Sequence, residues 1–352
     1  MRCRVAFPKR IEEDELAKKP ITIVTGFLGS GKTTLLKKAL SGGYGKNTAV
    51  LVNEFGEIGL DHHLLREVGE RTVLLGNGCV CCGTREDLVG VLLELLDLEE
   101  RDEIERLDRI VMETTGLADP APILHTVFTH PVLQHHYVVD VVACTVDAVN
   151  GEMQMERNPE SVRQVSAADR IVVTKADVAE REALQVVLSR LEAINPQADI
   201  VAASFGEVEP KILFEPVEKW RVRSFSTKGV HATLEKGLGK TYSTALAFDG
   251  PVDWTGFGIW LSMLLHARGE EVLRVKGLLD IGESGPVVLN GVQHIIHPPE
   301  HLHAWPDDEH SSRIVFICRG IHTSEIVCSL EAFSGVIGAG PRPLAADSGL
   351  RV

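Results

Sequence analysis

The sequence predicts an α/β fold: a doubly wound, mostly parallel sheet, with a second, smaller α+β domain. From about residue 20 to about residue 205, short and nearly continuous hydrophobic runs alternate with amphipathic helical segments. Strands of that kind belong to parallel sheets that are covered on both faces. Beyond that point, apolar and polar residues alternate as they do in antiparallel sheets. The length of 352 residues is also enough for two domains.

The first predicted domain spans residues 20–205. It opens with the β-branched strand "ITIVT" at 21–25, which leads through a glycine-rich turn into a helix at 32–40. A long amphipathic helix follows at 85–100. Further buried strands lie within the segments 48–52, 72–75, 109–116, 138–148, 170–177 and 198–204.

The second predicted domain spans residues 223–334, after a linker at 206–222. An alternating strand near 241–252 precedes a helix at 256–269, and a closing helix is expected at 324–333. The other strands are expected at 271–281, 286–297 and 312–320. Residues 1–19 are an N-terminal extension. Residues 335–352 are rich in Gly and Pro, and we expect a disordered tail there.

The composition excludes several classes of function. A formal net charge of −14 argues against nucleic acid as a partner, because phosphate binding needs a basic surface. The best candidate for a membrane span, at 88–98, contains Glu94 and Asp97 and fits an amphipathic helix instead. The N-terminus lacks the apolar core of an export signal, and seven cysteines suit a reduced compartment. We therefore expect a cytoplasmic protein with no membrane partner.

The segment "GFLGSGKT" at 26–33 matches G-x-x-x-x-G-K-[ST] between a strand and a helix. Backbone N–H groups of such a loop and of the following helix can surround phosphates. Lys32 is expected to reach the β- and γ-phosphates of a nucleotide, and Thr33 to bind Mg²⁺. The pattern indicates a P-loop NTPase. Its expected phosphate-binding residues are Gly26, Gly29, Ser30, Gly31, Lys32 and Thr33.

A second motif, "RIVVTKADV" at 170–178, bears on the choice of base. Asp177 can accept two hydrogen bonds from guanine, which adenine cannot donate, so Thr174, Lys175 and Asp177 favour GTP over ATP. Thr174 stands where the guanine motif usually has Asn, so one amide contact is lost. In an alternative interpretation, Asp177 caps a helix that begins near Val178.

The segment "RIVMETTGLADP" at 109–120 ends a strand predicted to lie beside the P-loop strand. NTPases of this kind hold a carboxylate near Mg²⁺ and the γ-phosphate, and Glu113 occupies that position. The N–H group of Gly116 can sense the γ-phosphate. Lys32 and Glu113 are therefore the expected catalytic residues. No water-positioning glutamine and no arginine finger can be singled out, so we expect slow intrinsic hydrolysis.

Three of the seven cysteines, Cys79, Cys81 and Cys82, lie on one turn, "GNGCVCCGT" at 76–84. The spacing is too compact for a structural zinc knuckle, but thiolates on one turn suit Zn²⁺, Co²⁺ or Cu⁺. Three ligands from one loop leave a position open for exchange. A redox turn, or thiols that only pack, remain alternatives.

The segment "VNEFGEIGLDHH" at 52–63 offers further metal ligands, of which Glu57 is the expected fourth. Glu54 and Asp61 are also available there, whereas His62 and His63 fit a solvated surface pair better. A later group of histidines does not match one clean metal site, and satisfied histidines on a strand and loop would give the same pattern. That group is His294, His297, His301, His303 and His310.

With the P-loop, "VNEFGEIGLD", "GNGCVCCGT", "ETTGLADP" and "TKAD" in this order, the chain resembles the CobW family of P-loop GTPases, which are metallochaperones or metal insertases. The resemblance extends from Pro20 to about Val336. It implies that Cys79, Cys81 and Cys82 bind metal, and that Thr34 joins the residues binding GTP and Mg²⁺. The long histidine-rich insert of some relatives is absent.

The resemblance implies a slow GTPase that binds Zn²⁺, or alternatively Co²⁺, and delivers it to a client metalloprotein. GTP is expected to favour a tightly metal-binding form, and hydrolysis to GDP to loosen it. Two alternatives stay open. In the first, the protein assists a cobalt enzyme, as in cobalamin synthesis or nitrile hydratase activation. In the second, it is a nucleotide-dependent regulatory module with structural cysteines. We expect a monomer or a metal-dependent dimer.

Overall fold

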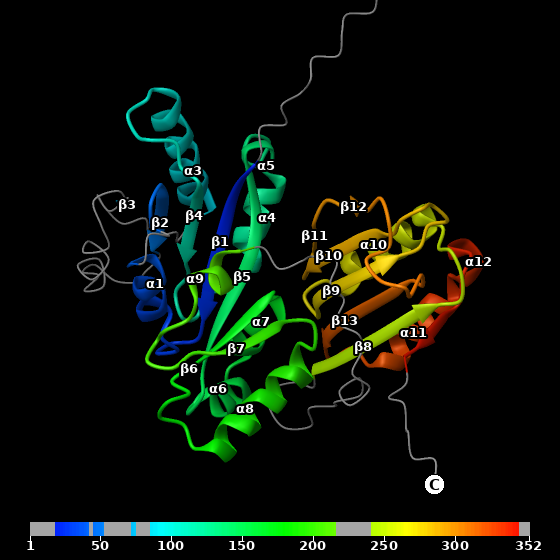
Figure 1. Cartoon of the computed structure of the whole chain (residues 1–352). Coiled ribbons are helices and arrows are strands. Elements are labelled where there is room, and N and C mark those ends of the chain that lie inside the picture. Colours follow the sequence, from blue (N-terminus) through cyan, green and yellow to red (C-terminus); the bar gives the residue numbers. More distant parts are fainter. Residues whose placement is uncertain (1–17, 42–44, 53–71, 75–84, 216–240, 345–352) are drawn as a thin grey trace, which may run out of the picture.

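The computed structural model describes residues 18–41, 45–52, 72–74, 85–215 and 241–344. Within these residues the chain forms two sheets (Figure 1). The first is a parallel sheet with helices on both faces, and the second is an antiparallel sheet with helices on one face. The predicted fold class is confirmed.

The first sheet has the strand order β3-β2-β4-β1-β5-β6-β7, which places the P-loop strand β1 between β4 and β5. Its strands are β1 (Lys19–Gly26), β2 (Thr48–Val52), β3 (Thr72–Leu74), β4 (Arg109–Glu113), β5 (Tyr137–Asp147), β6 (Arg170–Thr174) and β7 (Asp199–Ala202). Its helices are α1 (Lys32–Ser41), α3 (Arg85–Glu100), α4 (Ala121–Thr129), α5 (Leu133–His136), α6 (Gly151–Arg157), α7 (Pro159–Ala167), α8 (Arg181–Ile194) and α9 (Pro210–Phe214).

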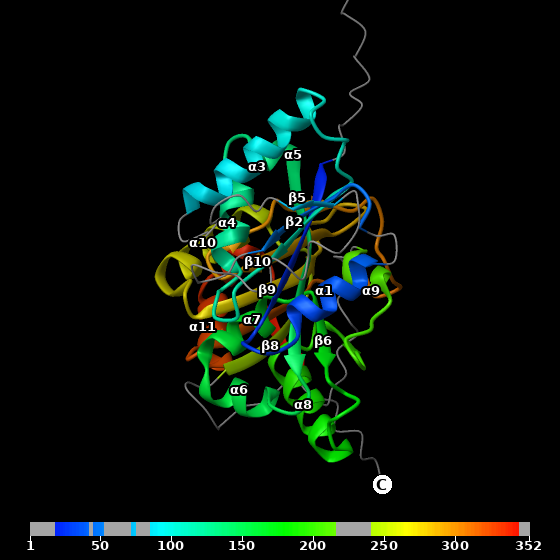
Figure 2. The ribbon, with the colours of Figure 1, turned by 90° about the vertical axis from the view of Figure 1, so that its left-hand side faces the viewer.

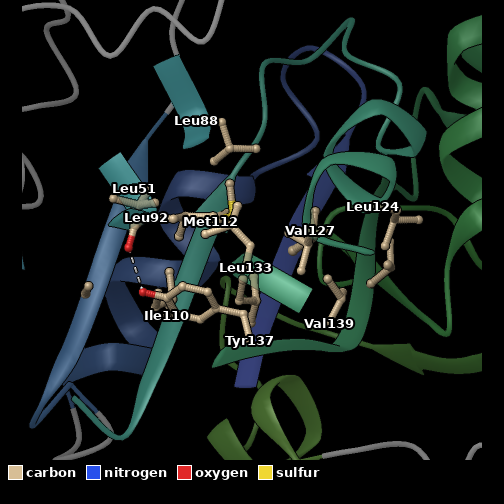
Figure 3. Packing of buried hydrophobic residues seen from close by; sticks show 14 of the residues in the cluster. Leu51, Leu88, Leu92, Ile110, Met112, Leu124, Val127, Leu133, Tyr137 and Val139 are labelled. Carbon is tan, nitrogen blue, oxygen red and sulfur yellow. Dashed lines mark hydrogen bonds between the residues drawn. The ribbon is translucent and has the colours of Figure 1, made fainter. Parts of the chain in front are cut away.

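Alternate residues of each central strand enter different cores, which explains the nearly continuous hydrophobic runs. In β4, Ile110 and Met112 pack toward α3, α4 and α5, whereas Val111 packs toward α1 and α9. Figure 2 shows these two sets of helices on opposite sides of the sheet. Figure 3 shows the first core, where the Tyr137 hydroxyl donates to the carbonyl of Leu92 at 2.9 Å. Burial raises the pKa of that tyrosine.

The second sheet has the order β11-β10-β9-β13-β8-β14, and β12 pairs with β10. Its helices, on the face away from the first domain, cover an aromatic core that includes Phe257, Trp260 and Phe316. The strands are β8 (Thr241–Phe248), β9 (Val272–Leu279), β10 (Val287–Val292), β11 (Ile295–Ile296), β12 (Glu300–His301), β13 (Arg313–Arg319) and β14 (Pro341–Pro343). The helices are α10 (Trp254–Arg268), α11 (Thr323–Ala332) and α12 (Ser334–Ile337).

The expectation of a disordered tail from residue 335 is wrong for its first part. Helix α12 ends at Gly338, which has a φ of 81°, and the chain then returns to the sheet as β14. Strand β14 pairs antiparallel with β8, and the N–H of Leu344 donates to the carbonyl of Ala245. Two prolines are tolerated there because β14 is an edge strand. Residues 345–352 lie outside the described residues.

The predicted linker at 206–222 also needs correction. Residues 210–214 form α9, and Phe214 is only 3 % exposed in the core beneath α1. This segment therefore belongs to the first domain. Residues 216–222, like the N-terminal extension up to residue 17, lie outside the described residues. In the described parts of the chain, no helix is both long and apolar enough to cross a membrane.

Candidate nucleotide and metal site

The P-loop connects β1 to α1 through three glycines in the left-handed or a related positive-φ region. Gly26, Gly29 and Gly31 have φ of 140°, 72° and 89°. A Cβ on Gly26 would lie 2.3 Å from the Thr145 hydroxyl, so no other residue fits there without displacing β5. The Ser30 hydroxyl lies 2.6 Å from the same threonine oxygen. The loop is therefore held against β5 and leaves its N–H groups at the N-terminus of α1, which is a site for phosphate.

Lys32 is the first residue of α1 and is 9 % exposed. Its ammonium group donates to the carbonyls of Gly26 at 2.9 Å and Phe27 at 3.2 Å. These contacts hold the positive charge over the loop, where a bound phosphate chain would need it.

Thr33, in the first turn of α1, contacts Glu113, the last residue of β4. The Thr33 hydroxyl donates to Glu113 Oε1 at 2.6 Å, and Glu113 is 5 % exposed. A hydroxyl oxygen and a carboxylate oxygen at this distance are the donor types that Mg²⁺ prefers beside phosphates. The residues present therefore fit a Mg²⁺ ion.

The loop after β4 packs directly on the P-loop. A Cβ on Gly116 would lie 2.7 Å from the backbone nitrogen of Leu28, so a glycine is needed for this approach. Gln164 of α7 donates to the carbonyls of Gly116 at 3.2 Å and Ala118 at 2.9 Å. Gln164 is fully buried, and the sequence analysis did not single it out.

The end of β6 is tied to the P-loop by side chains of the "TKAD" motif. The Thr174 hydroxyl donates to the carbonyl of Ser30 at 2.7 Å. Lys175 donates to the carbonyl of Gly29 at 2.9 Å and to Asp147 Oδ2 at 2.7 Å. Thr174 thus supports the loop, which is a role that does not require the amide of asparagine.

Asp147, at the end of β5, is a site residue that sequence reasoning missed. Its side chain is 2 % exposed, and burial alone would raise the pKa of the carboxyl. The hydrogen bonds from Lys175, Asn150 and the backbone of Val149 instead hold that pKa below its usual range. Asp147 ends a strand and belongs to no motif, so no pattern in the sequence pointed to a role for it.

The alternative that Asp177 caps a helix is wrong. Helix α8 begins at Arg181 with Glu180 as its N-cap residue, and Asp177 instead accepts the N–H of Phe205 at 2.8 Å. Phe205 has a φ of 55° and is 72 % exposed. The next residue, Gly206, approaches Thr34, since its Cβ would lie 3.1 Å from that threonine's methyl group. The turn at 204–207 therefore lies between the "TKAD" motif and α1.

The structure brings together, at the carboxyl edge of the first sheet, every predicted nucleotide residue. The predicted metal ligands Cys79, Cys81, Cys82 and Glu57 lie outside the described residues. Among the described residues, no group of three or more His, Cys, Asp or Glu side chains could hold a metal ion. His297 packs on Phe128, with ring centroids 4.3 Å apart, and its Nδ1 lies 3.2 Å from the Asn290 amide.

Two family models match the chain. Residues 20–202 match the nucleotide-binding domain of CobW, HypB and UreG, and residues 242–334 match the C-terminal domain of the cobalamin synthesis protein CobW. The chain belongs to the CobW family. This family is one of P-loop GTPases, as the resemblance predicted.

Three similar proteins carry zinc in their names. The zinc chaperone YjiA of Escherichia coli is 36 % identical over 322 residues, which cover 90 % of this chain and 98 % of YjiA. The zinc chaperone CobW of Pseudomonas aeruginosa is 36 % identical over 230 residues, which cover 56 % of this chain and 60 % of that protein. The zinc-regulated GTPase metalloprotein activator 1 of Schizosaccharomyces pombe is 34 % identical over 197 residues, which cover 54 % and 47 % of the two chains.

Solved structures of YjiA GTPase with Zn(II) bound share the fold. The E. coli protein superposes with a TM-score of 0.69 at 29 % identity, covering 90 % of this chain and 99 % of that one. A triple mutant of YjiA, also bound to Zn(II), gives a TM-score of 0.70 at 30 % identity over the same shares.

Proposed function

We propose that this protein is a GTP-hydrolysing zinc chaperone that couples its nucleotide state to the delivery of Zn²⁺ to a client metalloprotein. One observation carries the proposal: Lys32, the Thr33–Glu113 pair and Asp177 meet at one sheet edge. They do so in a chain that is 36 % identical to a zinc chaperone along 90 % of its length.

The chain's own residues supply the steps of hydrolysis. The N–H groups of Gly29, Ser30 and Gly31 bind the phosphates, and Lys32 turns from the loop carbonyls to the β- and γ-phosphate oxygens. Thr33 and Glu113 would hold Mg²⁺, which would neutralise charge on the transferring phosphoryl group. Gly116, packed on Leu28, places its N–H beside the γ-phosphate.

Asp177 and the aliphatic part of Lys175 bind guanine. Asp177 accepts from the ring N–H and the exocyclic amine of the base, and ATP is disfavoured because adenine does not offer this pair of donors to the carboxylate. The missing amide at Thr174 does not weaken the loop, since its hydroxyl bonds the Ser30 carbonyl at 2.7 Å. No glutamine or arginine is assigned to the attacking water, and the intrinsic rate is therefore slow.

Zinc is the cargo, and Cys79, Cys81 and Cys82 with Glu57 are its proposed ligands. Strand β3 ends at Leu74, and the segment bearing these thiols follows; strand β2 ends at Val52, and the segment bearing Glu57 follows. Both strands run parallel to β4, so both strands end at the edge of the sheet where Glu113 lies. This shared edge supports coupling between γ-phosphate and metal.

Hydrolysis assays with controlled free metal test the function. Phosphate release from GTP is measured with Mg²⁺ at buffered free Zn²⁺ and then at buffered free Co²⁺, for the parent and for a Cys79/Cys81/Cys82→Ala variant. We expect stimulation by Zn²⁺ that the variant loses. Stimulation by Co²⁺ alone would reassign the cargo to cobalt, and a rate that ignores both metals would contradict coupling.

Reciprocity offers a second test. If GTP tightens zinc binding by some factor, zinc must tighten GTP binding by the same factor. Zinc titrations with a non-hydrolysable GTP analogue and with GDP measure that factor directly. Equal zinc affinities in the two states would overturn the coupled mechanism and leave a nucleotide-binding module with structural cysteines.

A further inference from the structure

A side chain of the second domain reaches the loop that follows Glu113. Gln293 lies at the turn between β10 and β11, and its amide donates to Asp119 Oδ2 at 2.6 Å. Asp119 is three residues beyond Gly116, which packs on the P-loop. Gln293 has a φ of 53°, a conformation that is uncommon for residues other than glycine.

Asp119 is a junction for several groups around the same loop. Its Oδ1 accepts the N–H of Ala121 at 3.0 Å, which stabilises the start of α4. Its Oδ2 also lies 4.0 Å from Arg163 of α7. Gln164 of α7 holds the carbonyls of Gly116 and Ala118 from within the first domain. Gln293 is thus the contribution of the second domain to a loop otherwise held by the first.

The turn that carries Gln293 is firmly seated on the first domain. Val292 and Ile295, on either side of it, are buried in the same core as the residues of α4. Nearby, the buried guanidinium of Arg274 donates to the carbonyl of Ala167 at 2.7 Å and to Asp169 at 2.5 Å. These contacts fix the position of the turn that carries Gln293 independently of its hydrogen bond to Asp119. The hydrogen bond can therefore restrain the loop that contains Asp119.

We propose that Gln293 is a positioning residue for GTP hydrolysis, which acts through Asp119 to keep Gly116 in place against Leu28 of the P-loop. The inference rests on the GTP hydrolysis proposed above and deepens it: it assigns to the second domain control over the loop beside the γ-phosphate. The base and the α- and β-phosphates are bound by other segments, so Gln293 acts on the reaction and not on nucleotide affinity.

Steady-state hydrolysis and GDP binding of the full chain test the inference. Gln293→Ala is expected to lower kcat about tenfold, which corresponds to ~1.4 kcal/mol of barrier, with the KM for GTP and the Kd for GDP unchanged. His294→Ala is the matched control, because this exposed neighbour lies on the same turn and its ring faces His125. Its kcat should equal that of the parent.

Two exchanges whose charge changes cancel when they are combined separate positioning from general damage. Gln293→Glu places a carboxylate against Asp119 and should lower kcat at least as far as Gln293→Ala. Adding Asp119→Asn to it restores a hydrogen bond with donor and acceptor exchanged, while the remaining carbonyl oxygen can still accept from Ala121. We expect the double variant to regain most of kcat.

Two results would overturn the inference. One is a Gln293→Ala variant with the parent's kcat. The other is a fall in kcat that Asp119→Asn does not rescue in the Gln293→Glu background, although GDP binding shows that variant to be folded. A parent without GTP hydrolysis would instead overturn the proposed function, and this inference with it.

Discussion

The two sheets of this protein place their polar groups differently. The first buries polar side chains at one edge, where Lys32, Glu113 and Asp147 lie within reach of positive-φ glycines. The second buries Arg274 and Arg313, which hold an interface and a loop: Arg313 pairs with Asp307 and Glu309, each at 2.9 Å. In the first sheet, buried charges such as Lys32 and Glu113 lie at the proposed nucleotide site, whereas Arg274 and Arg313 of the second sheet attach an interface and a loop.

The cores differ in the same sense. The first sheet is packed mainly by aliphatic residues on both faces, and its site residues lie at the ends of its strands. The second depends on an aromatic cluster on one face, and its other face meets α7 of the first domain through Val162. Substitutions in the core of the second domain should therefore change the free energy of unfolding without changing GTP hydrolysis. The exceptions are expected where Gln293 and Arg274 join the domains.

The largest effect is expected from the aromatic core of the second domain. Trp260 is 1 % exposed, donates to Ser329 at 3.0 Å and packs edge-on to Phe316. Trp260→Ala should lower the free energy of unfolding by about 4 kcal/mol, because it leaves a large cavity. Urea unfolding measures the loss. Ile259→Ala, at an exposed position of the same helix, should change stability by no more than about 0.5 kcal/mol.

The domain junction should respond almost as strongly. Arg274→Met leaves the largely buried carboxylate of Asp169 without the guanidinium that pairs with it, and we expect about 3 kcal/mol of lost stability. Combining it with Asp169→Asn should recover much of that loss, since a neutral pair needs no compensation. Urea midpoints of the three variants decide the matter. A double variant as unstable as the sum of the singles would contradict a coupled pair.

A change in the site itself should leave stability intact. Lys32→Ala should lower GTP hydrolysis by about 100-fold, or ~2.7 kcal/mol of transition-state stabilisation, because it removes a charge that contacts the phosphoryl oxygens. Phosphate release measures the rate, and melting temperature reports the fold. Lys37→Ala on the same helix is the control. A comparable loss of rate in both variants would mean that Lys32 has no special role.

The junction also predicts a pH dependence. Burial alone would raise the pKa of Asp169, but Arg274, Lys276 and the N–H of Val142 hold it below its usual range. A carboxyl whose pKa is lowered by folding stabilises the native state above the unfolded pKa of ~3.9 and loses that contribution as pH falls through the folded value. Urea unfolding between neutral and acid pH should show this decline in the parent, and a shallower one in Arg274→Met.

The smallest effect concerns the start of α10. Asp253 accepts the N–H of Gly256 at 2.7 Å, and Asp253→Ala should cost about 1 kcal/mol of stability. Asp253→Ser retains an acceptor and should cost less. GTP hydrolysis should be unaffected by either, since the helix lies on the face of the second sheet away from the first domain.

The P-loop could be predicted because its function demands fixed glycines at fixed spacing, and Gly26, Gly29 and Gly31 adopt the conformations that this demand implies. The position of Thr33 followed from the P-loop motif, and that of Glu113 from a strand predicted to lie beside the P-loop strand. Asp147 could not be predicted, because its partner Lys175 is 28 residues away and neither spacing nor periodicity links them.

Strand β14 and the Gln293–Asp119 hydrogen bond could not be predicted from the sequence, because both depend on contacts between distant segments. Strand β14 contains two prolines in a Gly-rich segment, so composition argued against order, whereas pairing with β8 supplies it. The Gln293–Asp119 hydrogen bond joins residues 174 apart and depends on how the two domains meet. The cysteine turn was predicted from the sequence, but its residues lie outside the part of the chain that the structure describes, so it stays a prediction.

The central place of β1 has a consequence for synthesis on the ribosome. Ile21 pairs with Ile110 on one side and with Val139 on the other, so β1 must wait for partner strands that are translated much later. The P-loop emerges early, but Thr145 and Thr174, which support it, come more than a hundred residues after it. A nascent chain stopped before β5 would carry the phosphate motif without the sheet that shapes it, and would offer an open strand edge to chaperones and proteases.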